Sequence, residues 1–220
     1  MEDSKMSGCK VVLLGDSGVG KTCIIARYIS GTFDKNSPTT NGASFCCKNV
    51  RFEQLDKNLL LDIWDTAGQE KYKSLSKFFY KDAAVCILVY DVTLKESFDS
   101  LKNYWYNQIK EFSEPDIVLG VAGNKYDLFE HEKVKEEEAR EWAKEIGAVF
   151  ELTSAQNNTG INDLFTKVGY KYLDPTFNPK IEIGSKQDRE NNPQQIKIVL
   201  DKKDLKKDTN KKNKKSCCEK

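Results

Sequence analysis

Short apolar runs alternate with longer amphipathic segments along the first 175 residues of the chain. The runs are bounded by turn-forming residues and cover residues 11–14, 59–64, 83–90, 117–122 and 149–152. Continuous apolar runs of this length are typical of strands that are buried on both faces, as in a parallel sheet. Their alternation with helical segments predicts an α/β fold with helices on both faces of the sheet.

Three of the amphipathic segments repeat apolar residues every three or four positions, which is the spacing of one buried helix face. These residues are Phe98, Leu101, Trp105, Ile109 and Phe112; Ala139, Trp142, Ala143 and Ile146; and Ile161, Leu164, Phe165 and Val168. The spacing predicts three helices, and we interpret the aromatic residues on them, Trp105 and Trp142, as core packing. Residues 23–29 predict a further helix.

One pair of strands lacks a helix between its members. Residues 43–52 are separated from the apolar run 59–64 by a short segment that contains the turn-forming residues Asp56, Lys57 and Asn58. Consecutive strands joined by a short loop pair antiparallel in a hairpin. We therefore expect a mixed, mostly parallel six-stranded sheet with one antiparallel edge.

The composition of the 220-residue chain changes near residue 176. Residues 8–175 carry nearly all of the large apolar side chains, whereas residues 176–220 are rich in Lys, Asp, Asn and Gln. A segment with so little apolar surface cannot bury enough of it to fold. The sequence thus predicts one globular domain over 8–175 and a disordered, lysine-rich tail over 176–220, and the formal net charge of +1 averages the two.

The cysteines and the N-terminus indicate a cytosolic protein. The seven cysteines form no C-x-x-C pair, and His131 is the only histidine, so we expect no zinc site. Residues 1–7 lack the apolar core of a signal peptide, and no window approaches the roughly 20 apolar residues of a membrane span. We expect reduced thiols.

Residues 15–22 read G-D-S-G-V-G-K-T and match the phosphate-binding pattern G-x-x-x-x-G-K-[ST]. A glycine-rich turn could match by chance, but here a predicted strand precedes the pattern and a predicted helix follows it. The glycines can adopt positive φ, which lets backbone N–H groups surround an anion at the helix N-terminus. We expect Lys21 to reach the β- and γ-phosphates and Thr22 to ligate Mg²⁺. The predicted phosphate-binding residues are Gly15, Asp16, Ser17, Gly18, Val19, Gly20, Lys21, Thr22 and Cys23.

A second motif follows the strand at 59–64, where the chain reads Asp65-Thr66-Ala67-Gly68-Gln69. Alone, it is an ordinary polar turn. Next to a phosphate loop, Asp65 can hold Mg²⁺ through a water, and the N–H of Gly68 can meet a γ-phosphate. Gln69 can orient an attacking water, which suits a reaction in which positioning and charge stabilisation supply the catalysis.

Two loops are predicted to recognise the base. The carboxylate of Asp127 can accept hydrogen bonds from N1–H and the 2-amino group of guanine, a pair of donors that adenine lacks, so the nucleotide is GTP or GDP rather than ATP. Asn124 would tie this loop to the phosphate loop, and the stem of Lys125 can lie along the base. The second loop contains Ser154 and Ala155 and could offer a backbone N–H to the guanine carbonyl.

These motifs, in this order and at this spacing, resemble those of the small GTPases of the Ras superfamily, over residues 8–173. Residues 64–75 with the following Phe79-Tyr80 resemble the switch II segment of the Rab family, and residues 90–98 resemble its Y-D-[IV]-T and ESF segment. The phrase G-A-S-F at 42–45 leans towards the early-endosomal and related Rabs. The resemblance implies a GTP/GDP switch that uses Mg²⁺, hydrolyses GTP and regulates vesicle trafficking.

The resemblance also implies roles for single residues. Thr40 is similar to the switch I threonine that closes over Mg²⁺ and the γ-phosphate, and Phe33 to an aromatic residue that packs near guanine. The implied metal residues are thus Thr22, Thr40 and Asp65; the catalytic residues are Gln69, Lys21 and Thr40; and the effector surface is Phe45, Trp64 and Phe79. The chain departs from the family pattern at Asn41, Asp82 and Gln156, where an apolar residue, a glycine and a lysine are usual.

The end of the chain resembles the C-C-x-x terminus of Rabs rather than a C-a-a-X box. Cys217 and Cys218 follow a segment, 201–215, with eight lysines and three aspartates. The resemblance implies two geranylgeranyl chains, which suffice for stable anchoring, with the lysines adding attraction to an anionic cytoplasmic leaflet. Nucleic-acid binding is an alternative that the missing aromatic interleaving disfavours. A merely solubilising tail is another alternative.

The resemblance implies as partners a guanine-nucleotide exchange factor, a GTPase-activating protein, a GDP-dissociation inhibitor and Rab effectors, and it implies a monomer that binds no nucleic acid. It also implies a location on the cytoplasmic face of an intracellular membrane, with an endosomal membrane as the candidate, and cycling through the cytosol. Two alternative functions remain. A non-hydrolysing GTP-bound scaffold is disfavoured by Gln69, and a Ras- or Rho-like signalling GTPase at the plasma membrane is disfavoured by the paired terminal cysteines.

Overall fold

The structure, a computed structural model, describes residues 7–40, 42–66 and 81–176. Six strands form one sheet in the order β2-β3-β1-β4-β5-β6. Every neighbouring pair is parallel except β2 with β3. The predicted mixed, mostly parallel sheet with one antiparallel edge is therefore confirmed. The strands are β1 (Ser7–Leu14), β2 (Ala43–Phe52), β3 (Lys57–Thr66), β4 (Val85–Asp91), β5 (Val118–Asn124) and β6 (Val149–Leu152).

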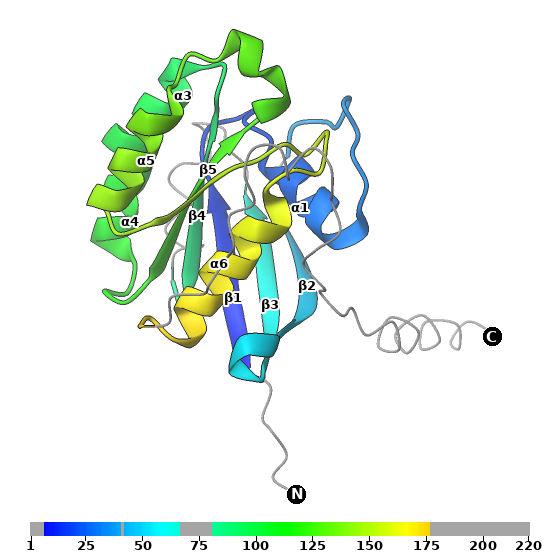
Figure 1. The fold of residues 1–220 in the computed structure, drawn as a ribbon, viewed down its shortest axis with the longest axis vertical. Coiled ribbons are helices and arrows are strands. Elements are labelled where there is room, and N and C mark those ends of the chain that lie inside the picture. The colour runs from blue at the N-terminus through cyan, green and yellow to red at the C-terminus, as the bar shows by residue number, and fades with distance from the viewer. Residues whose placement is uncertain (1–6, 41, 67–80, 177–220) are drawn as a thin grey trace, which may run out of the picture.

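The predicted helices are present in the described segments, and Figure 1 shows α6, in yellow, crossing the sheet. The one predicted around residues 98–112 is built from three consecutive pieces, the middle one a π-helical turn. None of the described helices combines the length and apolarity needed to cross a membrane. The helices are α1 (Lys21–Ser30), α3 (Lys95–Ser100), the π-turn η3 (Leu101–Trp105), α4 (Tyr106–Phe112), α5 (Glu136–Glu145) and α6 (Ile161–Leu173), with short 3₁₀ turns η1 (Glu53–Leu55) and η4 (Tyr126–His131).

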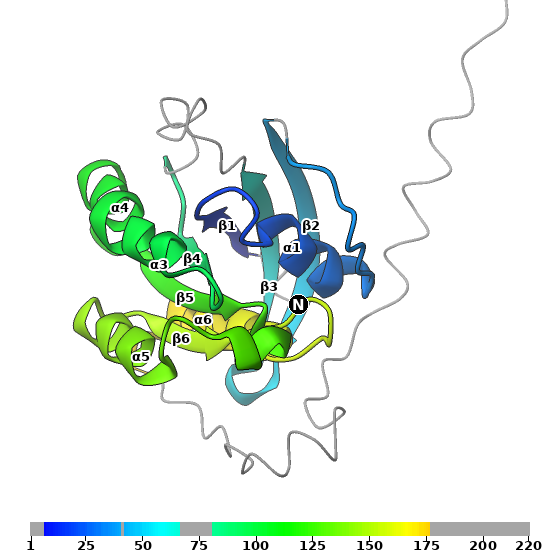
Figure 2. The same cartoon turned by 90° about the horizontal axis from the view of Figure 1, so that it is seen from above.

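Two apolar cores lie on the two faces of the sheet. Because successive side chains of a strand point to opposite faces, Val11 and Leu13 of β1 pack with residues of α1 and α6, while Val12 and Leu14 pack with residues of α3, η3, α4 and α5. Figure 2 shows α3, α4 and α5 grouped together, away from α1. The prediction of helices on both faces is thus confirmed.

The turn between β2 and β3 differs from the prediction. It is formed by η1 and Asp56, whereas Lys57 and Asn58 already pair with β2, opposite Phe52 and Arg51. Asp56 has a left-handed backbone with φ of 49°, a conformation that Asp tolerates better than most residues. The chain therefore reverses at Asp56, and β3 begins two residues earlier than its apolar run indicates.

Candidate functional site

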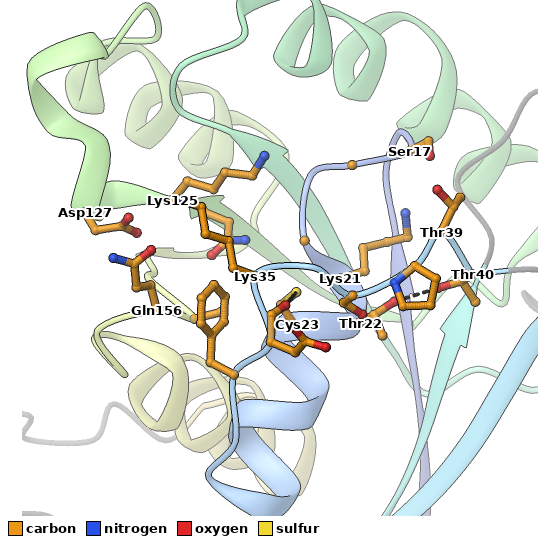
Figure 3. Close-up of a pocket in the computed structure, with 18 of the residues that line it drawn as sticks. Ser17, Lys21, Thr22, Cys23, Lys35, Thr39, Thr40, Lys125, Asp127 and Gln156 are labelled. Atoms are coloured by element: carbon orange, nitrogen blue, oxygen red, sulfur yellow. Dashed lines mark hydrogen bonds between the residues drawn. The ribbon is translucent and has the colours of Figure 1, made fainter.

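A cavity of about 410 Å³ lies where several strands end at their carboxyl termini. Its walls come from the loop after β1, the start of α1, the segment before β2, and the loops after β5 and β6. Figure 3 shows Lys21, Ser17 and Thr40 at one end of it and Asp127 and Gln156 at the other. Ligands of open α/β sheets bind at this edge, and the volume suits a small organic ligand.

Two glycines of the phosphate loop, Gly15 and Gly20, lie against neighbouring atoms that leave no room for a Cβ. Gly20 has a left-handed φ of 94°, and a Cβ there would lie 2.3 Å from Nδ2 of Asn124. A Cβ on Gly15 would lie 2.2 Å from the carbonyl oxygen of Val89. Of the predicted phosphate-binding residues, Ser17, Gly18, Gly20, Lys21, Thr22 and Cys23 line the cavity, whereas Gly15, Asp16 and Val19 do not line it.

Lys21 is a buried cation that forms no ion pair with any carboxylate in the described segments. Its side chain is 5 % exposed, and Nζ donates to the carbonyl oxygens of Gly15 at 2.8 Å and Asp16 at 3.0 Å. Burial lowers the pKa of Lys21 to about 8, against the opposing effect of the Asp65 and Asp16 carboxylates. An anion that enters the loop would stabilise the charged form of this lysine.

The three predicted metal residues meet at one point. The Thr22 hydroxyl donates to Oδ2 of Asp65 at 2.6 Å and is hydrogen-bonded to the Thr40 hydroxyl at 2.7 Å; the Thr40 hydroxyl is 3.3 Å from the same Oδ2. Oδ1 of Asp65 is buried and has no hydrogen-bond partner within the described segments. Burial raises the pKa of Asp65, against the opposing effects of Thr22, Lys21 and Thr40. Hydroxyl and carboxylate oxygens are ligands that Mg²⁺ prefers, so these residues fit that cation.

The base-recognition residues lie at the opposite end of the cavity. Nδ2 of Asn124 donates to the carbonyl of Val19 at 2.8 Å, so this residue ties its loop to the phosphate loop as predicted. Asp127, Lys125 and Ala155 line the cavity. Ser154 is 1 % exposed, and its hydroxyl donates to Oδ1 of Asp127 at 2.6 Å. Ser154 therefore orients the carboxylate that is predicted to read guanine.

Lys125 is held by a residue to which we assigned no role in the site. It has a left-handed backbone with φ of 63°, and its Nζ pairs with Oδ2 of Asp91 at 2.6 Å. The other oxygen of Asp91 accepts from the N–H and hydroxyl of Thr93 at 2.8 and 2.7 Å. A signal existed in the sequence, because Asp91 directly follows a predicted strand, as Asp65 does.

Trp105 is a second residue whose role in the site was missed. It is 1 % exposed, which agrees with the prediction of core packing, but its Nε1 also donates to Oδ1 of Asp16 at 2.9 Å. Because Trp105 ends the π-turn η3, this hydrogen bond anchors the phosphate loop to the long helix beside it. π-turns are frequent at functional sites.

The remaining predicted site residues within the described segments lie in the wall of the cavity or on the edge of the sheet. Phe33 and Gln156 line the cavity. On the sheet edge, Phe45 and Trp64 are paired across β2 and β3 with ring centroids 5.2 Å apart, and Phe45 is 54 % exposed. The predicted role of this pair as part of an effector surface stays a prediction.

Asp82 has a left-handed φ of 60°. The backbone at this position favours glycine, which is the residue expected there from the family pattern. Several predicted residues lie outside the described part of the chain, and their roles stay predictions; they are Asn41, Gly68, Gln69, Phe79, Cys217 and Cys218.

Known proteins are similar to this chain over the region that contains the cavity. The sequence model described as Ras family matches residues 10–174. The human Ras-related protein Rab-22A is 42 % identical over 178 residues, covering 80 % of this chain and 89 % of that protein. The human Ras-related protein Rab-31 is 43 % identical over 172 residues, covering 77 % and 86 %. A putative ras-related protein Rab-5B of Dictyostelium discoideum is 41 % identical over 162 residues, covering 73 % of each.

The matched region contains all the residues that surround the cavity. These relatives confirm the resemblance to the Rab family and its lean towards the early-endosomal and related Rabs. The chain belongs to the Rab family of small GTPases, within the Ras family.

Proposed function

We propose that this protein is a GTP/GDP switch that hydrolyses GTP slowly and regulates vesicle trafficking at the cytoplasmic face of an intracellular membrane. The observation that carries the proposal is that Thr22 and Thr40, which both contact Asp65, line one cavity with Lys21 and Asp127. The cavity thus offers cation-binding oxygens and a phosphate-binding lysine at one end, and a base-reading carboxylate at the other.

Each end of the cavity has a chemical task. Lys21 and the backbone N–H groups of the phosphate loop would hold the β- and γ-phosphates. Mg²⁺, when bound by Thr22, Thr40 and Asp65, would neutralise phosphate charge. Thr40 directly precedes the segment that leads into β2, and bound Mg²⁺ and γ-phosphate would strengthen its attachment there until hydrolysis releases it.

Hydrolysis would depend on Gln69, which we propose orients the attacking water. None of the arginines in the described segments lines the cavity. We therefore propose that intrinsic turnover is on the order of 10⁻⁴ to 10⁻³ s⁻¹, and that a GTPase-activating protein supplies the arginine that stabilises transition-state charge.

Membrane attachment would come from Cys217 and Cys218. We propose that both carry geranylgeranyl chains, that the lysines of 201–215 add attraction to anionic lipids, and that a GDP-dissociation inhibitor returns the protein to the cytosol. Effectors would bind the surface formed by Phe45, Trp64 and Phe79. The Rab relatives and the paired cysteines support a location on an intracellular membrane over one on the plasma membrane.

The test is single-turnover hydrolysis of GTP and of ATP by the purified monomer with Mg²⁺, beside the variants Gln69→Leu and Asp127→Asn. We expect slow cleavage of GTP only, a stalled reaction in Gln69→Leu, and about 100-fold weaker GTP binding in Asp127→Asn, because an amide cannot accept both guanine hydrogen bonds. Tight GTP binding without cleavage by the parent protein would instead support a non-hydrolysing scaffold.

A further inference from the structure

Arg27, in the last turn of α1, binds three backbone carbonyl groups from two separate parts of the chain. Nε donates to the carbonyl of Ala155 at 2.7 Å, Nη2 to that of Gln156 at 3.0 Å, and Nη1 to that of Gly31. The first two carbonyls lie 128 and 129 residues away along the sequence. The planar guanidinium fork is suited to holding several acceptors in fixed directions at once.

The loop that Arg27 holds is the one after β6, which lines the base end of the cavity. Ala155 and Gln156 both line it, and Arg27 itself does not. On its other side, the guanidinium lies 5.9 Å from the ring centroid of Phe33, which also lines the cavity. Arg27 thus lies outside the cavity, in contact with its loop and beside an aromatic residue that lines it.

A chain of hydrogen bonds links Arg27 to the base-reading carboxylate. The peptide group between Gln156 and Asn157 accepts from Arg27 through its oxygen and donates through the N–H of Asn157 to the Ser154 hydroxyl at 3.0 Å. The Ser154 hydroxyl in turn donates to Oδ1 of Asp127 at 2.6 Å. Because the peptide group is planar, fixing its oxygen also fixes the direction of its N–H.

We infer that Arg27 is a positioning residue for guanine recognition, which acts on Asp127 through the Gln156–Asn157 peptide and the hydroxyl of Ser154. Hydrogen bonds in such a chain also polarise one another. The inference rests on the proposed function, since it requires that Asp127 reads guanine. It adds that the selectivity of this carboxylate depends on an arginine that does not touch the nucleotide.

The test compares two nucleotides that differ at one of the two guanine groups that Asp127 is proposed to bind. Inosine diphosphate lacks the 2-amino group of GDP, so it can make only one of the two proposed hydrogen bonds. The dissociation constants of GDP and inosine diphosphate are measured by competition with a fluorescent GDP, using the full chain with Mg²⁺. The variants are Arg27→Lys, Arg27→Ala and Ser154→Ala.

We expect Arg27→Lys to weaken GDP binding about tenfold and inosine diphosphate binding about threefold, because lysine keeps the charge but cannot hold both carbonyls of the loop. The preference for GDP then falls about threefold. Ser154→Ala is expected to lower the preference for GDP by a similar factor. The double variant Arg27→Lys with Ser154→Ala should lower this preference no further, since both residues act through one chain of hydrogen bonds. Arg140→Lys is the matched control, because Arg140 pairs with Glu136 on α5 and does not line the cavity; it should change neither constant.

A purely structural role would weaken both nucleotides by the same factor, and that result would overturn the inference. An unchanged preference for GDP over inosine diphosphate in Ser154→Ala would also overturn the inference. This variant leaves Arg27 intact, so it keeps the inference testable if the Arg27 variants fail to fold. A parent protein that binds no GDP would reject the proposed function instead, so the two failures are distinguishable.

Discussion

Lys21 illustrates how a single residue can be favourable for binding and unfavourable for folding. This cation is buried, and within the described segments its hydrogen-bond partners are the neutral carbonyl groups of Gly15 and Asp16. Burial lowers its pKa from 10.5 to about 8. The unfolded chain therefore binds more protons than the folded one between about pH 8 and 10.5, and the destabilising effect of Lys21 is fully present below about pH 8.

We predict that Lys21→Met raises the free energy of unfolding of the nucleotide-free protein by about 1–3 kcal/mol at pH 7. The gain should shrink as the pH rises from about 8 towards 10.5, because the parent lysine then loses its buried charge in the folded state. The same variant should lose GDP binding. Urea unfolding at several pH values in the presence of a chelator measures the difference.

The control for this variant is Lys144→Met, which changes an exposed lysine on α5. It should have little effect at any pH. A gain in Lys21→Met that stays constant from pH 7 to 10 would show that the effect comes from packing rather than from the buried charge.

At the scale of elements, α6 is fitted closely to the β2–β3 hairpin. Gly169 of α6 faces Phe52, the last residue of β2, and a Cβ on Gly169 would lie 2.2 Å from Cζ of that ring. Phe52 is 1 % exposed and makes an edge contact with Tyr170 at a centroid distance of 4.9 Å. The glycine is therefore required by packing, although it weakens the helix.

We predict that Gly169→Ala destabilises the protein by about 1–2 kcal/mol, because overpacking against Phe52 outweighs the gain in helix propensity. Urea unfolding of the GDP-bound protein tests this. The double variant Gly169→Ala with Phe52→Leu should lose less than the sum of the two single variants, since the smaller side chain makes room for the methyl group. A higher urea midpoint for Gly169→Ala would contradict the packing argument.

At the scale of the molecule, the two cores define which residues form the folding unit. Their buried residues begin at Cys9 and end at Tyr170 within the described segments, and α6 ends at Leu173. Both cores share the same sheet, so their helices are expected to unfold with it as one unit. All of the buried residues in these two cores precede residue 177.

We therefore predict that a chain ending at Thr176 keeps the melting temperature of the full chain within about 2 °C and keeps its GDP affinity. Because it lacks Cys217 and Cys218, it should not bind anionic vesicles after treatment with a prenyltransferase, whereas the treated full chain should bind them. Calorimetry, nucleotide competition and vesicle sedimentation measure the three quantities. The variant with Cys217→Ser and Cys218→Ser is the matched control, because it keeps the tail and removes only the sites of lipid attachment. A markedly lower melting temperature of the shortened chain would show that the tail packs on the domain.

The sequence by itself determined the strands, the helices and the two ends of the nucleotide site. Their signals are local: an apolar run reports a buried strand, a period of three to four reports a helix face, and glycines beside Lys21 and Thr22 report a phosphate loop. Asn124 and Asp127 were found because short motifs at strand ends carry chemistry wherever parallel strands end together.

Only the tertiary structure decided which distant residues support that site. The hydrogen bonds of Trp105 to Asp16 and of Arg27 to Ala155 span 89 and 128 residues, and no periodicity or motif connects such partners. Even the hairpin turn was decided by the left-handed backbone of Asp56 and the register of β2 on β3. The physical reason is that a local pattern states what a segment becomes, whereas the partners of a side chain depend on which segments the completed sheet brings side by side.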